Sequence, residues 1–190
     1  HFKSELPYTK ADLNNNIALN IGRFTDVKQQ WILLEIWNTL INIKKITNWK
    51  LFIVGDGEHK QIFENYIKSN NLCSYVFLKP PKQDVDYYYK NSSLFLLTSK
   101  TEGFGMVLLE AISFGLPCIS FDCPSGPRDI IINNKNGFLI TQNNNNEYLE
   151  CVVKLITNNN LKMGMGTKAF ESSKDWDDDK LLNEWYTILN

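Results

Sequence analysis

Two glutamates, Glu102 and Glu110, stand eight positions apart in the largely apolar segment TEGFGMVLLEAISFGLPCIS (residues 101–120). An apolar segment favours burial, and a buried ionised carboxylate is costly unless hydrogen-bond donors offset its desolvation. The residues around Glu110 offer few such donors, whereas a carboxylate can accept two sugar hydroxyls side by side. The competing interpretation is that Glu102 stabilises a helix N-terminus and that Glu110 lies on a solvent-exposed stripe.

The turn between the two glutamates also carries a chemical signal. If Gly103, Phe104 and Gly105 form a turn, a helix begins near Met106, and its first N–H groups have no partner within the helix. These groups and the helix dipole favour an anion at that end. The segment therefore predicts an anion site next to carboxylates.

A basic pair follows the first expected strand, in the segment GRFTDVKQ. Gly22 allows a tight turn there, and Arg23 and Lys28 stand five residues apart near a helix start. An arginine fork and a lysine point charge could hold a diphosphate from two directions. Taken alone, the pair fits solvated surface charges better than a binding site.

A glycine-rich turn, VGDGE, follows the second expected strand. Gly55 and Gly57 would let the backbone approach a ligand closely, although many strand-to-helix turns use glycine for the turn alone. The segment is not the G-x-G-x-x-G fingerprint of dinucleotide binding, because position 60 is Lys60. By itself this turn predicts little.

Composition narrows the class of protein. The chain has 190 residues, 43% of them hydrophobic and 13% aromatic, which suffices for one globular domain with a sizeable core. The formal net charge of −1 and the lack of a basic run argue against nucleic acid as a partner. No apolar stretch is long enough to span a bilayer, and the amino-terminal residues lack the layout of a signal peptide. We expect a soluble chain.

Cysteine and histidine usage argues against a metal site. No C-x-x-C pair occurs, and only His1 and His59 could add soft ligands, so a zinc site is not expected. We also expect no other metal and no cofactor. Unpaired thiols fit a reducing compartment, so we expect a cytoplasmic protein. Peripheral association of a longer protein with the inner face of the cytoplasmic membrane stays open. The cysteines are Cys73, Cys118, Cys123 and Cys151.

Short apolar runs alternate with segments of helical spacing. This alternation predicts an α/β fold, a Rossmann-like doubly wound parallel sheet of about six strands with helices on both faces. Ligands of such sheets bind beyond the carboxyl ends of the strands, where the residues above stand. The expected strands are 17–22, 50–55, 75–79, 93–99, 117–122 and 137–141. The expected helices are 28–45, 58–70, 84–91, 105–115 and a series from Glu147 onward, with asparagine clusters at 14–16, 143–146 and 158–160 marking loops or helix starts.

The segment EGFGMVLLEA resembles the E-x7-E motif of retaining glycosyltransferases of the GT-B fold, in the large family 4 (glycosyl transferases group 1) that uses activated nucleotide sugars. The resemblance extends from about residue 16 to residue 176, because GRFTDVKQ, VGDGE, EGFGMVLLEA, GLPCIS and GPRDII follow in the family's order. It implies the C-terminal, donor-binding half of an enzyme that transfers a sugar from a nucleotide-sugar, with UDP expected from family frequency, to an acceptor glycan or lipid-linked glycan.

Matched residue by residue, the resemblance implies a donor site. Arg23 and Lys28 would hold the diphosphate of the donor, and Glu102 would face the hydroxyls of the transferred sugar; these are the expected catalytic residues. Glu110 would accept the ribose hydroxyls. The other expected donor-binding residues are Gly22 and Gly55, Leu78 and Lys79 beside the base, and the turn of Phe104, Gly105 and Met106, whose N–H groups would meet phosphate or sugar.

The chain departs from the family pattern after two of its strands. Ser125-Gly126-Pro127 and Asp129 stand where the family often has Gly-Gly-Pro and a later Glu, and this D-C-P-S-G-P form resembles the subset that builds bacterial surface polysaccharides. At Pro80-Pro81 no glycine follows the third strand, so the expected contacts to the base are less secure.

The resemblance also implies a domain plan. Residues 1–15 would be a linker from an acceptor-binding half, residues 16–175 the donor-binding domain, and residues 176–190 a C-terminal helix. The acidic segment DWDDD (175–179) by itself fits the first turn of a helix better than a metal site. Alone, this half would bind the donor without turnover, because catalysis needs an acceptor oriented against it.

The resemblance suggests a front-face displacement in which Arg23, Lys28 and a helix N-terminus stabilise the leaving diphosphate. A non-catalytic nucleotide-binding module on the same scaffold is the main alternative function. A receiver-type signalling module fits less well, because it needs clustered acids after the first strand, where Gly22 and Arg23 stand.

Overall fold

The computed structural model describes residues 10–81 and 85–176 of the chain. Most of the expected linker and nearly all of the expected C-terminal helix, including most of the DWDDD segment, lie outside the described residues. The domain boundaries therefore stay predictions. Within the described residues, no helix combines the length and apolar character needed to cross a membrane.

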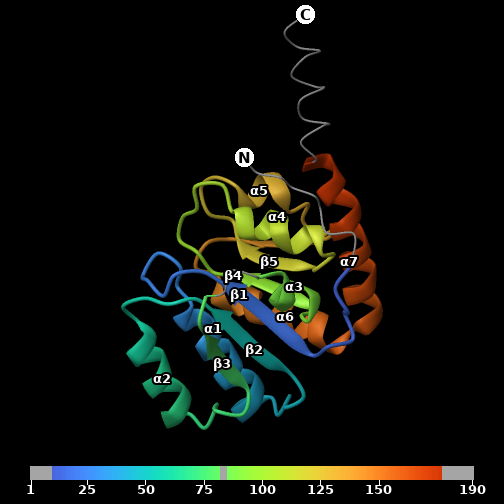
Figure 1. The fold of residues 1–190 in the computed structure, drawn as a ribbon. Helices are drawn as coiled ribbons and strands as arrows, with labels where there is room; N and C mark the ends of the chain where they lie inside the picture. Colours follow the sequence, from blue (N-terminus) through green and yellow to red (C-terminus); the bar gives the residue numbers. More distant parts are fainter. Residues whose placement is uncertain (1–9, 82–84, 177–190) are drawn as a thin grey trace, which may run out of the picture.

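The core of the molecule is one six-stranded sheet in which every pairing is parallel, with strand order β3-β2-β1-β4-β5-β6. This topology confirms the doubly wound sheet expected from the alternating apolar runs (Figure 1). The order changes direction between β1 and β4, which is the switch point where open α/β sheets bind ligands. The strands are β1 (Ile17–Ile21), β2 (Lys50–Val54), β3 (Val76–Lys79), β4 (Leu94–Leu97), β5 (Cys118–Phe121) and β6 (Gly137–Ile140).

Helices cover both faces of the sheet, as Figure 1 shows. One face packs against α1 (Trp31–Asn38), its continuation η1 (Thr39–Ile43), α2 (Lys60–Ser69) and α6 (Asn145–Thr157). The opposite face packs against α3 (Asp86–Lys90), α4 (Met106–Ser113) and α5 (Pro127–Ile130). The long helix α7 (Asn159–Ser173) contacts both α4 and α6 and ends in the short turn η2 (Lys174–Trp176).

The expected helix over 28–45 begins later and ends differently. Its first residues belong to the loop after β1, and the helix starts at Trp31. Its last turn, η1, is a π-helix in which Lys44 donates its N–H to the carbonyl of Thr39. The buried pairs 32–33, 36–37 and 40–41 repeat every four residues, which is more than the 3.6 residues of an α-helical turn. A wider turn therefore keeps Leu40 and Ile41 on the core side.

Two of the asparagine clusters start helices, as expected. The side chain of Asn144 accepts the N–H of Glu147, and that of Asn158 accepts the N–H of Leu161. Each cap satisfies one of the N–H groups that a helix start leaves without an intrahelical partner. The short helix α5 was not expected; it follows Ser125 and Gly126, both of which have positive φ, and starts with Pro127.

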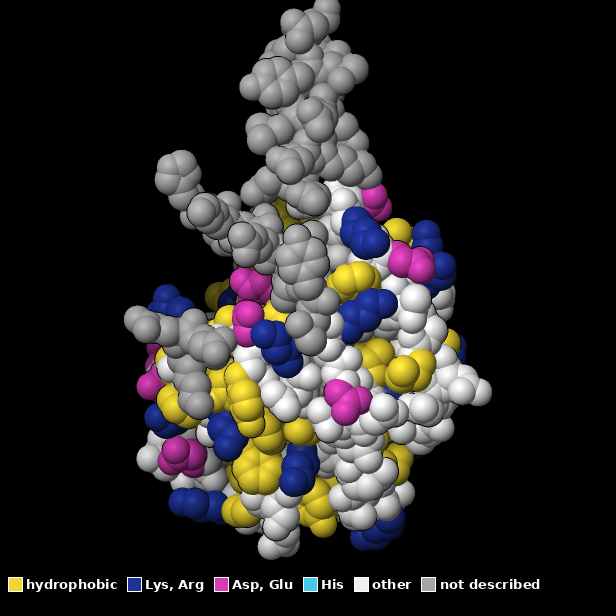
Figure 2. Space-filling model, turned by 45° about the vertical axis from the view of Figure 1, so that its right-hand side comes forward, with side chains coloured by type: hydrophobic (Ala, Val, Ile, Leu, Met, Phe, Trp, Pro, Cys, Tyr) yellow, Lys and Arg dark blue, Asp and Glu magenta, His cyan; other side chains and the backbone are white. Residues whose placement is uncertain are grey.

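On the side of the molecule shown in Figure 2, basic and acidic side chains are interspersed with apolar ones. This distribution agrees with a chain whose formal net charge is only −1. All four cysteines are free, and Cys118 and Cys123 are buried.

Candidate functional site

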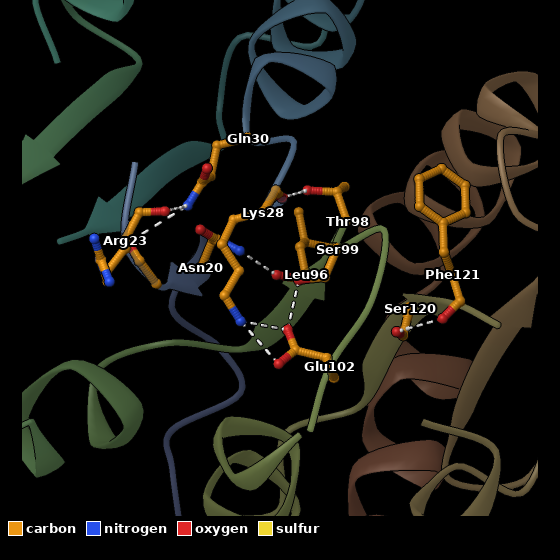
Figure 3. Close-up of polar contacts among 11 residues, drawn as sticks. Asn20, Arg23, Lys28, Gln30, Leu96, Thr98, Ser99, Glu102, Ser120 and Phe121 are labelled. Atoms are coloured by element: carbon orange, nitrogen blue, oxygen red, sulfur yellow. Dashed lines mark hydrogen bonds and ion pairs between the residues drawn. The ribbon is translucent and has the colours of Figure 1, made fainter. Parts of the chain in front are cut away.

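The loops that leave β1, β4 and β5 meet at the carboxyl edge of the sheet. β1 leads toward α1 on one face and β4 toward α4 on the opposite face, so their loops diverge and expose the strand ends between them. The predicted residues Arg23 and Lys28 lie on the first of these loops and Glu102 on the second (Figure 3). The sheet topology thus brings together residues that are more than seventy positions apart.

Lys28 and Glu102 form an ion pair (Figure 3). The Lys28 ammonium lies 2.6 Å from Oε1 and 2.8 Å from Oε2 of Glu102, and the Ser99 hydroxyl donates to the same Oε1 at 2.5 Å. The Glu102 side chain is only 8% exposed, compared with 25% for Lys28. The family resemblance predicts that Lys28 binds the diphosphate of a donor and that Glu102 binds its sugar. The structure shows that the two side chains also bind each other.

Three hydrogen bonds hold the loop that carries Lys28. The buried Gln30 amide donates to the carbonyl of Arg23 at 2.9 Å, and the buried Thr98 hydroxyl donates to the carbonyl of Lys28 at 2.9 Å. The Lys100 N–H donates to the carbonyl of Val27 at 2.8 Å. Sequence reasoning missed Gln30 and Thr98, because a polar residue near a strand end or helix start has many ordinary explanations.

Arg23 does not join the ion pair. Its side chain is exposed, and Figure 3 shows its guanidinium apart from the Lys28–Glu102 pair. One loop carries both residues, and their expected grip on a diphosphate stays a prediction.

The turn before α4 has the expected form. The helix begins at Met106, and the preceding Gly105 has a φ of 85°, in the left-handed region that favours glycine. Phe104 and Met106 are both 39% exposed. A Cβ atom added to Gly126 would lie 1.8 Å from the carbonyl oxygen of Phe104, so the loop after β5 packs directly against this turn.

Glu110 lies inside α4 and is half-buried rather than on a fully exposed stripe. The hydroxyl of Tyr89, on α3, donates to its Oε2 at 2.6 Å. Burial raises the pKa of Glu110, and the hydrogen bond from Tyr89 acts in the opposite direction. Sequence reasoning missed Tyr89, which is one of three consecutive tyrosines in a segment that was expected only to form a helix.

The glycines at the ends of β1 and β2 have different roles. A Cβ on Gly55 would lie 2.1 Å from the carbonyl oxygen of Gly22, so these two loops are in backbone contact and Gly55 has a structural reason to be glycine. A Cβ on Gly22 would make only ordinary contacts, 3.5 Å from the Gln30 amide and 3.6 Å from the Lys28 side chain. An approach of either glycine to a donor stays a prediction.

Leu78 and Lys79 stand at the end of β3, where the base was expected. Successive strand residues point to opposite faces of a sheet. Leu78 packs toward the face with α1 and α2, whereas the Lys79 ammonium lies on the other face, 5.2 Å and 5.4 Å from the ring centres of Phe52 and Phe77. The two side chains thus lie on opposite faces of the sheet, and a contact of this segment with a base stays a prediction.

A charged pair that the sequence did not predict lies beyond β5. The Arg128 guanidinium donates to the two carboxylate oxygens of Asp122 at 3.0 and 3.1 Å.

Across residues 10–81 and 85–176, no group of three or more His, Cys, Asp and Glu side chains is placed to hold a metal ion. An open groove between η1 and α6 contains none of the predicted site residues.

The chain matches a known protein family along most of its length. Residues 4–172 match the family model described as "Glycosyl transferases group 1". An uncharacterised glycosyltransferase of Haemophilus influenzae is 37% identical over 185 residues, which is 97% of this chain and 52% of that protein. The amylovoran biosynthesis glycosyltransferase AmsD of Erwinia amylovora is 35% identical over 92% of this chain and 48% of its own length.

A solved structure shares the fold along nearly the whole chain. It is a mutant of S. aureus TarM in complex with fondaparinux, α-GlcNAc-glycerol and UDP, with a TM-score of 0.85 and 29% identity over 97% of this chain and 37% of that one. The present chain thus spans about half the length, or less, of these relatives. By its sequence match and its fold, the chain belongs to the glycosyl transferases group 1 family, with the GT-B type of Rossmann-like domain.

Proposed function

We propose that the chain is the donor-binding half of a retaining glycosyltransferase that transfers a sugar from a UDP-sugar to an acceptor glycan or lipid-linked glycan in the synthesis of a bacterial surface polysaccharide. The observation that carries this proposal is the meeting of Lys28, Glu102 and the N-terminus of α4 at the switch point of the sheet. The UDP bound to S. aureus TarM supports a UDP-sugar as the donor, and the amylovoran role of AmsD supports a part in polysaccharide synthesis.

The diphosphate would lie between the N-terminus of α4 and the loop that carries Arg23 and Lys28. A lysine ammonium has three N–H donors, and Glu102 offers only two oxygens to Lys28, so one donor is left for phosphate. Lys28 can then bind the donor without releasing Glu102. The exposed Arg23 would swing onto the diphosphate from the other side.

The two glutamates would bind different hydroxyls of the donor. Glu102, held by Lys28 and Ser99, would accept hydrogen bonds from the transferred sugar. Glu110 would accept the ribose hydroxyls, and the N–H groups of Gly105 and Met106 would meet phosphate or sugar. The base would lie at the end of β3, beside the segment of Leu78 and Lys79.

In a front-face displacement, negative charge develops on the leaving diphosphate as the bond to the sugar breaks. Arg23, Lys28 and the N-terminus of α4 would stabilise this charge, and such preorganised donors usually supply the largest share of catalysis. The acceptor would come from the other half of the enzyme, so we propose that this chain alone binds donor without turnover. We further propose that donor binding needs no metal ion.

The test is the thermal stability of this chain in the presence of UDP, GDP and ADP. A ligand at ~100 times its dissociation constant adds about 2.7 kcal/mol, which corresponds to an increase in Tm of roughly 5–10 °C for a domain of this size. We expect UDP to give the largest shift, with and without EDTA. The absence of any shift with all three nucleotides at millimolar concentration would contradict the donor site, and a shift abolished by EDTA would contradict metal-free binding.

A further inference from the structure

A buried tyrosine lies directly behind the candidate ribose ligand. Tyr89 has no exposed surface, and its hydroxyl donates to Oε2 of Glu110 at 2.6 Å. The carbonyl oxygen of Val107 lies at 3.4 Å from the same hydroxyl and is the weaker acceptor. Glu110 is therefore the main partner of this hydroxyl.

Neighbouring rings hold Tyr89 in place. Its ring stacks on Phe114 with 5.2 Å between centroids and an interplanar angle of 10°, and Phe95 lies 5.9 Å away on the same face of the sheet. Burial raises the pKa of Tyr89 well above its ordinary value, so the hydroxyl keeps its proton and acts as a donor. A fixed ring with a protonated hydroxyl presents one donor in one direction.

This contact has a consequence for Glu110. A glutamate side chain has several rotatable bonds and loses conformational entropy when a ligand orders it. The Tyr89 hydroxyl takes one site on Oε2 and orients the carboxylate before any ligand arrives. The other acceptor sites of the carboxylate are left for a ligand, and less ordering is needed on binding.

We propose that Tyr89 is a positioning residue for nucleotide recognition, which holds Glu110 so that its carboxylate meets the 2′- and 3′-hydroxyls of the donor's ribose together. This inference rests on the proposed function, in which Glu110 is the ribose ligand. Helix α3 would then support the donor site through Tyr89, although no residue of α3 contacts the donor itself.

The chain offers a matched control for this proposal. Tyr148, on α6, is also fully buried, but it lies on the opposite face of the sheet and its hydroxyl donates to the backbone carbonyls of Ile119 and Leu97 at 2.9 and 3.3 Å. Removing either hydroxyl deletes one buried O–H donor. Only one of the two deletions alters a carboxylate of the candidate site.

The experiment compares Tyr89→Phe and Tyr148→Phe by calorimetric titration with UDP and with 2′-deoxy-UDP. We expect the wild-type chain to prefer UDP about ten-fold or more. Tyr89→Phe should reduce this preference to about three-fold or less, because the carboxylate loses its fixed orientation, whereas Tyr148→Phe should leave the preference unchanged. An unchanged preference in Tyr89→Phe, or an equal loss in both variants, would overturn the proposal.

Glu110→Gln separates this proposal from the one on which it rests. If Glu110→Gln loses the ribose preference while Tyr89→Phe keeps it, Glu110 is the ribose ligand and Tyr89 is not its positioning residue. If Glu110→Gln keeps the wild-type preference, the ribose assignment itself fails, and the role of Tyr89 fails with it.

A spectroscopic measurement covers the case in which Tyr89→Phe does not fold. With 3-fluorotyrosine incorporated only at position 89, the ¹⁹F resonance reports on the hydroxyl and its partner. We expect UDP to shift this resonance more than 2′,3′-dideoxy-UDP does, and we expect Glu110→Gln to remove the difference. Equal shifts with the two nucleotides would show that Tyr89 does not sense ribose binding at Glu110, which contradicts the proposal.

Discussion

The two glutamates of the E-x7-E segment lie in different electrostatic surroundings. Glu102, in the loop before α4, is paired with the Lys28 ammonium and accepts the Ser99 hydroxyl. Glu110, inside α4, has the neutral Tyr89 hydroxyl as its partner, and burial raises its pKa. Glu102 is therefore half of a charge-neutral ion pair, whereas the group that donates to Glu110 is uncharged. The two carboxylates of one sequence motif are thus held by different interactions, an ion pair at Glu102 and a hydrogen bond from a neutral hydroxyl at Glu110.

The largest effect on UDP binding should come from Lys28→Ala, which removes the ion pair with Glu102. This change leaves the nearly buried Glu102 without its cation and removes one contact to the diphosphate. We expect UDP to bind about 100-fold more weakly, roughly 3 kcal/mol, as for the loss of one partner of a part-buried charge pair. Uridine, which lacks the diphosphate, should lose much less. Titration calorimetry with both ligands measures the difference.

Lys168→Ala is the control for that experiment. Lys168 also pairs with a glutamate, Glu171, at 2.8 Å, but both side chains are exposed on α7. Exposed pairs contribute about 0–1 kcal/mol, so this variant should bind UDP like the wild type. Equal losses for UDP and uridine in Lys28→Ala would remove Lys28 from the diphosphate site.

Exchanging each glutamate for glutamine should separate their roles. Glu110→Gln keeps the volume but replaces one carboxylate oxygen by an amide nitrogen that cannot accept, so the roughly ten-fold preference for UDP over 2′-deoxy-UDP should shrink toward one. Glu102→Gln should keep that preference and lose only the additional affinity that the sugar of a UDP-sugar supplies. If both variants change the same ratio, the two carboxylates do not have separate ligands.

The next largest effect concerns Glu110 and the pH dependence of the free energy of unfolding. Because burial raises the folded-state pKa of Glu110, the folded chain holds this proton more tightly than the unfolded chain. Glu110 therefore costs no stability below its unfolded pKa of about 4.3, and its cost develops as pH rises through the raised folded value. Asp86 adds to the rise and the hydrogen bond from Tyr89 reduces it. Glu110→Gln should remove this loss of stability, as measured by denaturant unfolding from pH 4 to pH 8.

The same protonation should weaken the ribose preference of the wild-type chain. A protonated Glu110 carries one fewer acceptor site, so the preference for UDP over 2′-deoxy-UDP should be smaller at pH 5 than at pH 8. A ratio that stays constant over this range would mean that Glu110 does not bind ribose as a carboxylate.

The smallest expected effect concerns the loop that holds Lys28. Thr98→Val keeps the side-chain shape but removes the hydrogen bond to the Lys28 carbonyl, at a cost of about 1 kcal/mol, which should weaken UDP binding about five-fold. The ribose preference should not change, because Glu110 is held from α3. Thr157→Val, which removes a hydroxyl bonded to the carbonyl of Val153 on the exposed side of α6, is the control. A loss of ribose preference in Thr98→Val would show that the two regions are not independent.

The sequence was sufficient to predict the sheet. The six observed strands fall within the expected ranges, because strands buried on both faces of a parallel sheet are continuous apolar runs that a helix of ordinary length does not imitate. It also predicted the start of α4 at Met106, since Gly105 supplies the left-handed turn that precedes it. Local pattern failed at η1 and α5, where core packing and the loop contact at Gly126 determine the backbone.

For the site, the sequence determined which chemical groups are available: two carboxylates, two cations and a helix start, in an order that resembles one family. Only the tertiary structure decided which of them are partners. Lys28 and Glu102 are separated by 74 positions and meet because parallel strands bring the loops that follow them to one edge of the sheet. Tyr89 and Glu110 are separated by 21 positions and meet because α3 and α4 cover the same face of the sheet. Pairing at such distances depends on strand order and on which face each helix covers, neither of which is encoded in the spacing of residues along a single segment.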